Sequence, residues 1–151
     1  RAPGDVAHRV RSGDGDEAVA EVARVLVAGG RFLLIDTTVP DGPAGDFTNR
    51  IDLLRDPSHV GALTIAEWEQ LLNASGFNVV AEESFRKRHE MTEWTGRSRM
   101  TEPDRIALER EMFDAPDEIR ESLIFEIDAD RVVAWTDTKT LFVADLPDSD
   151  R

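Results

Sequence analysis

The sequence predicts an α/β fold built on a mainly parallel sheet. Helical and strand patterns alternate between residues 16 and 85, and this alternation is typical of right-handed crossovers between parallel strands. The segment RFLLIDTTV (residues 31–39) is almost continuously apolar, as expected of a strand covered on both faces. With 151 residues, 40% of them hydrophobic and 32% charged, the chain suits one soluble globular domain over residues 1–151.

Charge and composition exclude several classes of protein. With 18 basic and 31 acidic residues the net charge is −13, and such a surface repels nucleic acids and anionic membranes. No apolar run reaches the roughly 20 residues of a membrane helix, and the N-terminus lacks the apolar centre of a secretory signal. The absence of cysteine excludes disulfides and thiolate chemistry. We expect a cytoplasmic protein, either adapted to a salt-rich cytoplasm or an ordinary acidic one.

The first predicted helix spans residues 16–27. Asp16 is a suitable N-cap, and Gly29 and Gly30 end the helix because glycine adopts left-handed turns without steric cost. The apolar stripe of this helix consists of Val19, Val22, Val25 and Leu26. The apolar strand at residues 31–39 follows directly.

The segment PDGPAGD (residues 40–46) contains four Pro or Gly residues and predicts a loop. Asp46 then caps a short helix, which ends before Pro57 because the residue preceding a proline is forced out of the helical region. One face of this helix is apolar, formed by Phe47, Ile51 and Leu54. The helix therefore ends in the polar segment LLRDPSHV (residues 53–60).

The next helix has the sharpest local signal in the chain. Thr64 and Glu67 form a capping box, and Gly76 closes the helix. The apolar stripe consists of Ile65, Trp68, Leu71 and Leu72. Core packing is therefore favoured for the tryptophan of this stripe. The strand FNVVAEESF follows, with Phe77, Val79, Ala81 and Phe85 on one side.

Two or three short helices and then further strands are predicted in the remainder. Residues 91–98 and 102–123 are predicted to be helical, and Thr101 is a suitable cap with Pro103 in the first turn. The strands predicted after them are residues 124–135, in two parts around a turn at 128–130, and residues 138–146.

No motif supports nucleotide-loop, metal or nucleophile chemistry. SGDGD (residues 12–16) lacks a preceding strand and a third glycine, and its aspartates would repel a phosphate, so we interpret it as a linker and helix start. His8, His59 and His89 have no partner at metal-ligand spacing, so no metal site is predicted. The sequence contains no Gly-x-Ser-x-Gly elbow.

Three residues are compatible with acid–base chemistry. His8 and His59 can titrate near neutral pH. Asp36 ends the strand FLLI, and ligands of open α/β sheets bind beyond the carboxyl ends of strands. The alternative for Asp36 is a hydrogen-bond acceptor for loop amides.

Two stretches resemble a known family. DEAVAEVARVLVAGGRFLLIDTTVP (residues 16–40) resembles the helix, L-x-x-G-G turn and fifth strand of class I S-adenosylmethionine (SAM)-dependent methyltransferases. FTNRIDLLRDPSHVGALTIAEWEQLLNASGFNVV (residues 47–80) resembles the branch similar to ubiquinone/menaquinone C-methyltransferases, in which a stretch like N-x-x-x-x-L-R-D-P-S-H-V precedes E-W and G-F. VAH (residues 6–8) stands where that branch has an Ala-His-His-Phe-like motif, and Arg9 and Val10 replace its last two residues.

The resemblance implies the C-terminal part of a Rossmann-like methyltransferase sheet, with an antiparallel last strand and a small helical cover. Residues 1–15 match poorly, and residues 147–151 are a tail. Nothing in the chain matches the family's Gly-rich SAM loop, so weak or no SAM binding is expected of this polypeptide by itself. We therefore expect a fragment or a natural truncation, which joins a missing N-terminal half or forms a homo-oligomer.

The implied reaction is methyl transfer from SAM to a small-molecule acceptor, whose proton is taken by a histidine or carboxylate. The site residues that the resemblance implies are catalytic His8 and His59, cofactor-binding Ala7 and His8, and substrate-binding Asp36, Asn49, Arg50, Arg55 and His59. No metal, nucleic acid or membrane is implied.

Other interpretations stay open. A half sheet would leave an unpaired edge and an exposed apolar face, which suits a non-catalytic, self-associating or partner-docking module. An unrelated small α/β hydrolase or binding protein is a third hypothesis, for which the sequence offers no nucleophile. A salt bridge between Arg55 and Asp56, or a hydrogen-bonded corner that includes Ser58, competes with acceptor binding as the role of that segment.

Overall fold

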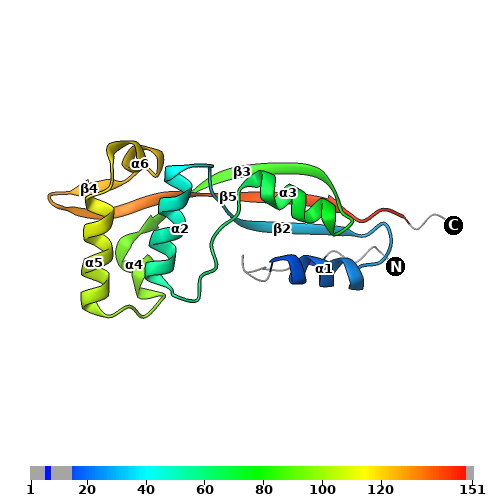
Figure 1. Ribbon diagram of the computed structural model, residues 1–151, viewed down its shortest axis with the longest axis horizontal. Helices are drawn as coiled ribbons and strands as arrows, with labels where there is room; N and C mark the ends of the chain where they lie inside the picture. Colours follow the sequence, from blue (N-terminus) through cyan, green and yellow to red (C-terminus); the bar gives the residue numbers. More distant parts are fainter. Residues whose placement is uncertain (1–5, 8–14, 149–151) are drawn as a thin grey trace. The chain divides into compact units, whose positions relative to one another are not determined.

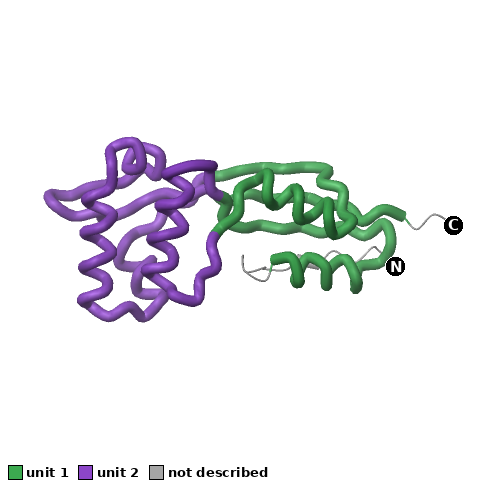
Figure 2. The backbone as a smooth tube through the Cα atoms, in the orientation of Figure 1, with its two compact units in different colours: residues 1–38, 62–85, 139–151 green, residues 39–61, 86–138 purple. Residues whose placement is uncertain are grey.

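The computed structural model of the chain describes residues 6–7 and 15–148. The chain divides into two compact units, which Figure 2 colours separately. Unit 1 comprises residues 1–38, 62–85 and 139–151, and unit 2 comprises residues 39–61 and 86–138. Each unit has a hydrophobic core of its own. Within the described ranges, every helix is too short or too polar to cross a membrane.

The described strands form one sheet (Figure 1). They are β1 (Val6–Ala7), β2 (Arg31–Thr38), β3 (Asn78–Glu90), β4 (Glu126–Asp128) and β5 (Arg131–Asp145). The strand order is β1-β2-β5-β3, and β4 pairs with β5. β1 and β2 are parallel, with Val6 opposite Phe32 and Ala7 opposite Leu33. β2 is therefore an interior strand, as predicted.

The prediction of a mainly parallel sheet is wrong, because most of the pairing is antiparallel. β5 lies between β2 and β3. Its contacts with β2 run in opposite directions along the chain, since Asp145 meets Arg31 at one end and Thr140 meets Thr38 at the other. β4 is also antiparallel to β5.

The burial of β2 explains the error. Phe32 and Leu34 are fully buried, whereas Ile35 is 50% exposed. The strand is thus covered mainly on one face, which is the usual state of antiparallel sheets. A continuous apolar run indicated burial on both faces because the sequence does not distinguish an exposed isoleucine from a buried one.

The core of unit 1 lies between the sheet and two helices, α1 (Gly15–Val25) and α3 (Ile65–Ala74). Trp68 is fully buried and its ring lies 6.3 Å from that of Phe142, so the prediction of core packing for this tryptophan is confirmed. The helix α1 ends two residues earlier than predicted, and Val25 is 55% exposed instead of facing the core. The buried core residues are Val19, Val22, Leu26, Phe32, Leu34, Trp68, Leu72, Phe77, Phe142 and Ala144.

The predicted capping box of α3 is confirmed. The Thr64 hydroxyl accepts a hydrogen bond from the Glu67 amide at 3.1 Å, and the Glu67 carboxylate accepts one from the Thr64 amide at 2.7 Å. Gly76 follows the helix with φ of 92°, a left-handed conformation that favours glycine. Local sequence therefore determines both ends of this helix.

β3 differs from its predicted form. It runs on to Glu90 and is exposed along most of its length, including Ala81 and Phe85, which were predicted to lie on the same side as Phe77 and Val79. β3 is the last strand in the described sheet order, and its charged residues protect such an outer strand from pairing with other chains.

Unit 2 contains α2 (Pro43–Arg55), which begins earlier than predicted: its N-cap is Gly42, and Asp46, the predicted cap, lies in its first turn. Pro43 lies in its first turn, where a missing N–H costs nothing, so the Pro/Gly-rich segment starts a helix instead of a loop. A Cβ on Gly45 would lie 2.0 Å from the Pro40 carbonyl oxygen, so this position requires glycine. Ile51 is buried as predicted, whereas Leu54 is 43% exposed.

Three further helices complete unit 2: α4 (Met91–Gly96), α5 (Glu102–Phe113) and α6 (Asp117–Ser122). The predicted N-cap of α5 is confirmed, because the Thr101 hydroxyl accepts from the Asp104 amide at 3.3 Å. Helix α2 packs against α5 and α6. The buried residues of the unit 2 core are Ile51, Met91, Trp94, Leu108, Met112, Ala115, Ile119, Leu123, Val132 and Trp135.

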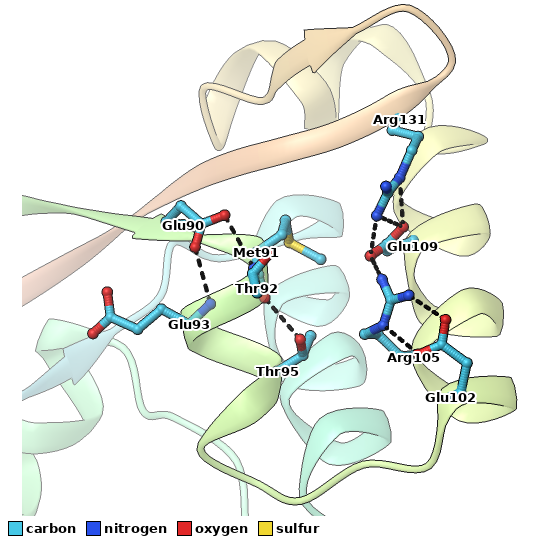
Figure 3. Close-up of polar contacts among 9 residues, drawn as sticks. All are labelled: Glu90, Met91, Thr92, Glu93, Thr95, Glu102, Arg105, Glu109 and Arg131. Atoms are coloured by element: carbon cyan, nitrogen blue, oxygen red, sulfur yellow. Dashed lines mark hydrogen bonds and ion pairs between the residues drawn. The ribbon is translucent and has the colours of Figure 1, made fainter.

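The two strands predicted around residues 128–130 are confirmed as β4 and the start of β5, with Ala129 at φ of 55° in the turn. β5 continues without a break to Asp145, so the predicted last strand is part of it. Figure 3 shows how this segment is fixed to α5: the Glu109 carboxylate accepts hydrogen bonds from Arg105 and from Arg131.

Candidate functional site

Four of the seven site residues expected from the sequence lie on α2 or just after it, in unit 2: Asn49, Arg50, Arg55 and His59. The helix ends at Arg55, and Asp56 is extended, with φ of −140° and ψ of 101°, as expected of a residue before proline. The Asp56 amide still donates to the Asp52 carbonyl at 2.9 Å. The chain therefore changes from helical to extended at Asp56, where the polar segment begins to leave the helix.

A buried carboxylate at this helix end escaped the sequence analysis. Asp52 is 7% exposed and lies between a guanidinium and an imidazole. Its Oδ1 is 3.7 Å from Arg55 Nε, and its Oδ2 is 3.8 Å from His59 Nε2. The spacing of three residues between Asp52 and Arg55, which puts both on one helix face, is the signal that could have identified it.

Arg55 also contacts the indole ring of Trp94 from α4. The guanidinium carbon lies 4.9 Å from the ring centroid, and Nη1 donates to the Trp94 carbonyl at 3.4 Å. A flat guanidinium on an indole face is held in orientation by the ring quadrupole. The arginine is thus fixed by a carboxylate and an aromatic ring, with 19% of its side chain exposed.

A second group of buried residues surrounds Trp94. The His89 imidazole is stacked on Trp135, with centroids 5.0 Å apart and an interplanar angle of 29°. Trp94 meets Trp135 edge-on at 4.9 Å. His89 Nε2 lies 2.9 Å from Asp137 Oδ2, and the two side chains are 8% and 6% exposed. No local sequence pattern indicates this arrangement, because its members come from β3, α4 and β5.

The segment after α2 forms the hydrogen-bonded corner that was one of the two interpretations. Asp56 Oδ1 accepts from the Ser58 amide at 3.0 Å and from its hydroxyl at 2.6 Å. These hydrogen bonds to the Ser58 side chain and backbone hold the pKa of Asp56 below its ordinary value. Arg55 takes no part in this corner and is directed to Asp52 and Trp94 instead.

Two other predicted acceptor residues lie on α2. Asn49 is partly buried and faces Gly61, where a Cβ would lie 3.7 Å from the Asn49 carboxamide oxygen. Arg50 is 65% exposed at its side chain and forms an ion pair with Glu111 of α5. The structure therefore brings Arg55 and His59 together around Asp52, whereas the side chain of Arg50 contacts Glu111 on α5.

Asp36 belongs to unit 1 and lies within β2, two residues before the strand ends. Its Oδ1 accepts from the Thr37 amide at 2.8 Å, so it is an acceptor for a backbone amide. Nearby hydroxyls form a row across the sheet, with Thr38 Oγ1 at 2.6 Å from Thr140 Oγ1 and Ser84 Oγ at 2.9 Å from the same atom. This end of β2 is polar although the strand is apolar.

The expected cofactor residues are described only in part. Ala7 ends β1 and pairs with Leu33 of β2, while His8 lies outside the described residues. Within the part of the chain that the structure describes, no three acidic or histidine side chains come together as metal ligands do.

Comparisons with known proteins find partial similarity to a methyltransferase and to an uncharacterized protein. The chain is 48% identical over 60 residues to the uncharacterized methyltransferase YcgJ of Bacillus subtilis (strain 168), which is 39% of this chain and 24% of YcgJ. It is 33% identical over 86 residues to the uncharacterized protein YafE of Escherichia coli (strain K12), which is 56% of this chain and 42% of YafE. No protein-family model matches the chain.

Solved structures are similar over more of the chain. A protein of Bacillus halodurans described as a candidate methyltransferase gives a TM-score of 0.89 at 26% identity, covering 95% of this chain and 69% of that one. The structure of YcgJ gives a TM-score of 0.85 at 25% identity, covering 96% of this chain and 64% of that one.

The sequence matches thus span less than half the length of the curated relatives. They do not specify the ubiquinone/menaquinone branch. The α/β fold of the chain is that of methyltransferase structures, and the chain is a partial match to class I methyltransferases.

Proposed function

We propose that this chain is part of a SAM-dependent methyltransferase that acts on a small-molecule acceptor, and that unit 2 supplies the acceptor side. The observation that carries the proposal is the similarity to a candidate methyltransferase over 95% of the chain, with a TM-score of 0.89. The antiparallel β5 supports assigning residues 1–151 to the C-terminal part of such a domain, because the resemblance implies an antiparallel last strand there.

The residues proposed for the acceptor are those around Asp52. His59 is 22% exposed at its side chain, so its imidazole can be reached from solvent while Asp52 orients it from the buried side. Arg55 supplies a permanent positive charge beside it. Asn49 adds a carboxamide on the same helix, and Asp36 of unit 1 remains a candidate for substrate binding.

SAM, when bound, supplies a methyl group on a positively charged sulfur, which leaves as a neutral thioether when the methyl bond to the acceptor forms. The chain's own task is to bind the acceptor and remove its proton. In this proposal His59 takes that proton on a ring nitrogen, and the Asp52 carboxylate stabilises the imidazolium that results. Arg55 stabilises the negative charge that develops on the deprotonated acceptor.

The direction of the parallel strands supports one position for the cofactor. β1 and β2 are parallel, so their carboxyl ends, at Ala7 and Thr38, lie toward the same edge of the sheet. Ligands of α/β sheets bind at that edge. Ala7 and His8 are therefore the residues proposed to bind the cofactor.

The test is transfer of a labelled methyl group from SAM to low-molecular-weight acceptors, using this chain and any longer protein that carries it. We expect His59→Gln to lower the transfer rate by about 100-fold, as loss of a general base does. Arg97→Gln is the control, because Arg97 is exposed and ion-paired with Glu93, away from the proposed site residues, and should leave the rate unchanged. Because weak or no SAM binding is expected of this polypeptide by itself, the result that would contradict the proposal is a longer protein that carries this chain, binds SAM and transfers no label to any acceptor.

A non-catalytic, self-associating module is the second candidate function. It is favoured by the face of the sheet opposite α1 and α3, where Ile35 of β2 is 50% exposed and Val80 of β3 is 53% exposed. Apolar surface on a sheet face favours association. Light scattering coupled to size-exclusion chromatography measures the mass directly, and a monomer at all accessible concentrations would count against this candidate.

A further inference from the structure

The outer edge of the sheet is formed by β3, which is accessible over a long stretch. β3 is the last strand in the described sheet order, so within the residues that the structure describes one of its edges has no neighbouring strand. Backbone N–H and C=O groups along such an edge pair readily with another strand. All residues from 81 to 88 are exposed, a stretch longer than a typical strand. A second chain can therefore reach this edge.

The charges of β3 are divided between its two halves. Residues 82 and 83 are both glutamate, and residues 86–88 are Arg-Lys-Arg. Phe85 lies between the two groups and is 46% exposed. Three consecutive basic residues are unusual in a chain with a net charge of −13. Such a strand is complementary to its own copy when the copy runs in the opposite direction, because the acidic half of each then meets the basic half of the other.

We infer that the free edge of β3 binds the same edge of a second copy of this chain, as an antiparallel strand pair with Phe85 opposite the partner's Phe85. In this register Glu83 lies opposite the partner's Lys87, because positions 83 and 87 are equally far from position 85. Glu82 lies opposite the partner's Arg88 for the same reason. The two-fold axis repeats every contact, so each charge pair occurs twice. This association does not depend on methyl transfer, and it uses a strand edge instead of the apolar sheet face around Ile35.

Glu83, Phe85 and Lys87 form the centre of the contact. They alternate along β3 and therefore lie on one face of the strand. Within the described residues neither Glu83 nor Lys87 has an ion-pair partner, so both are available to a second copy. Aromatic pairs and opposite-charge pairs on neighbouring strands each stabilise a sheet. The proposed register provides an aromatic pair at its centre and a charge pair on either side.

The outer charge pair relieves a repulsion within the single chain. Burial and the neighbouring Glu69 carboxylate of α3 raise the pKa of Glu82 above its ordinary value. Arg88 is already oriented by Glu126 of β4, to which its Nη2 donates at 3.1 Å, and its side chain is 54% exposed. A guanidinium held in this way can accept a second carboxylate, and it brings positive charge to Glu82.

The same charges make the strand selective. Charges on an outer strand oppose pairing with chains of other sequence, and a parallel copy in register would place like charges opposite each other. The antiparallel copy is the favoured partner, which is how charge order gives specificity. The net charge of −13 repels any two copies. At physiological ionic strength, however, charges more than roughly 8 Å apart are largely screened, whereas directly opposed side chains are closer than that.

The first test is charge reversal at positions 83 and 87, with the mass measured by light scattering coupled to size-exclusion chromatography. We expect the parent chain to form dimers. Glu83→Lys and Lys87→Glu should each raise the dimer dissociation constant by about tenfold or more, because two attractive pairs become two repulsive ones. The variant with both changes should dimerise like the parent chain. An equimolar mixture of the two single variants should form a mixed dimer, although neither variant dimerises by itself.

Asp41→Lys is the matched control, because it makes the same charge change as Glu83→Lys at an exposed position before α2. Both changes reduce the net negative charge, so a general charge effect would strengthen association in both variants. The inferred contact is lost only in Glu83→Lys. Since Glu83 and Lys87 have no ion pair within the described chain, their variants should leave the unfolding of dilute monomer unchanged, which circular dichroism checks. A monomeric parent chain, or a dimer that is insensitive to these charge reversals, would overturn the inference.

A cysteine at position 85 tests the register, because the chain has no cysteine of its own. Phe85→Cys places two thiols opposite each other at a Cα separation of about 5 Å, which a disulfide can span. Mild oxidation should therefore join two copies covalently. Ala81→Cys is the control, because position 81 would lie roughly 26 Å from its own copy, at about 3.3 Å for each of the eight intervening positions. Equal cross-linking of the two variants would overturn the proposed register.

Discussion

The imidazole of His89 and the carboxylate of Asp137 form a buried pair, with 2.9 Å between Nε2 and Oδ2. The two residues come from β3 and β5, and the imidazole is stacked on Trp135. Such a pair stabilises a unit mainly through the penalty of breaking it, because water cannot replace a missing partner in a closed core. It therefore connects two strands and the aromatic residues beneath Arg55.

We expect Asp137→Asn and His89→Gln each to lower the free energy of unfolding by about 3 kcal/mol, since each disrupts the buried contact between the imidazole and the carboxylate. Urea denaturation measures this change. Arg97→Gln is the control, because it breaks an exposed ion pair with Glu93 and should cost less than about 0.5 kcal/mol. If all three variants lose the same stability, the buried pair does not have the role described here.

Gly45 is predicted to be essential for the start of α2. A Cβ there would lie 2.0 Å from the Pro40 carbonyl, so Gly45→Ala must move the helix that carries Asp52 and Arg55. We expect a loss of about 1–3 kcal/mol in unfolding free energy. Gly96→Ala is the matched control, because no atom lies within 4 Å of its added Cβ, and it should be neutral or slightly stabilising. A neutral Gly45→Ala would contradict the close approach.

The capping box of α3 provides a third prediction. Thr64→Ala removes the hydroxyl that accepts from the Glu67 amide, so we expect a loss of about 1 kcal/mol in unfolding free energy. Gln70→Ala, at an exposed position of the same helix, should change stability little. Thermal or urea unfolding followed by circular dichroism measures both. Equal stabilities of the two variants would mean that the cap contributes nothing.

The carboxylate of Glu90 caps α4 and should make stability depend on pH. The backbone amides of Glu93 and Thr92 donate to it, which lowers the pKa of Glu90 below its ordinary value of 4.5 (Figure 3). Because the folded-state pKa is depressed, the stabilisation is present above pH 4.5 and is lost as pH falls through the folded-state pKa.

The variant Glu90→Gln tests this dependence. At pH 7 we expect it to be less stable than the parent chain by less than about 1 kcal/mol, because the carboxylate is largely exposed and screened. The difference should shrink at pH 3. Glu83→Gln, which removes an exposed carboxylate of the same strand, serves as the control. A difference that is the same at both pH values would show that the charge of Glu90 is not involved.

Features that depend on neighbouring residues were predictable from the sequence. The capping box of Thr64 and Glu67, the cap at Thr101 and the hairpin turn near Ala129 all involve residues within four positions of one another. The start of α2 was misplaced because a segment rich in Pro and Gly usually forms a loop, whereas Pro43 here occupies the first turn of a helix. The resemblance to methyltransferases could also be recognised from the sequence, because it rests on contiguous segments.

The candidate site was predictable only in part. Arg55 and His59 were predicted as site residues because they are polar residues at a helix end. The structure places both beside the buried carboxylate of Asp52. Asp52 was overlooked because an aspartate within a helix looks like a solvated residue until its burial is known. His89 and Asp137 are separated by 48 positions, the difference between their residue numbers, so no local pattern could pair them.

The sequence by itself determined both ends of α3 and the start of α5, that the chain has an α/β fold, and which class of enzyme it resembles, because these follow from short-range hydrogen bonding and contiguous patterns. Only the tertiary structure decided that β5 lies antiparallel between β2 and β3, and that His89 and Asp137 form a buried pair. Strand pairing and side-chain burial depend on contacts between distant segments, whose free energy is shared over the whole core and is not encoded at any single position.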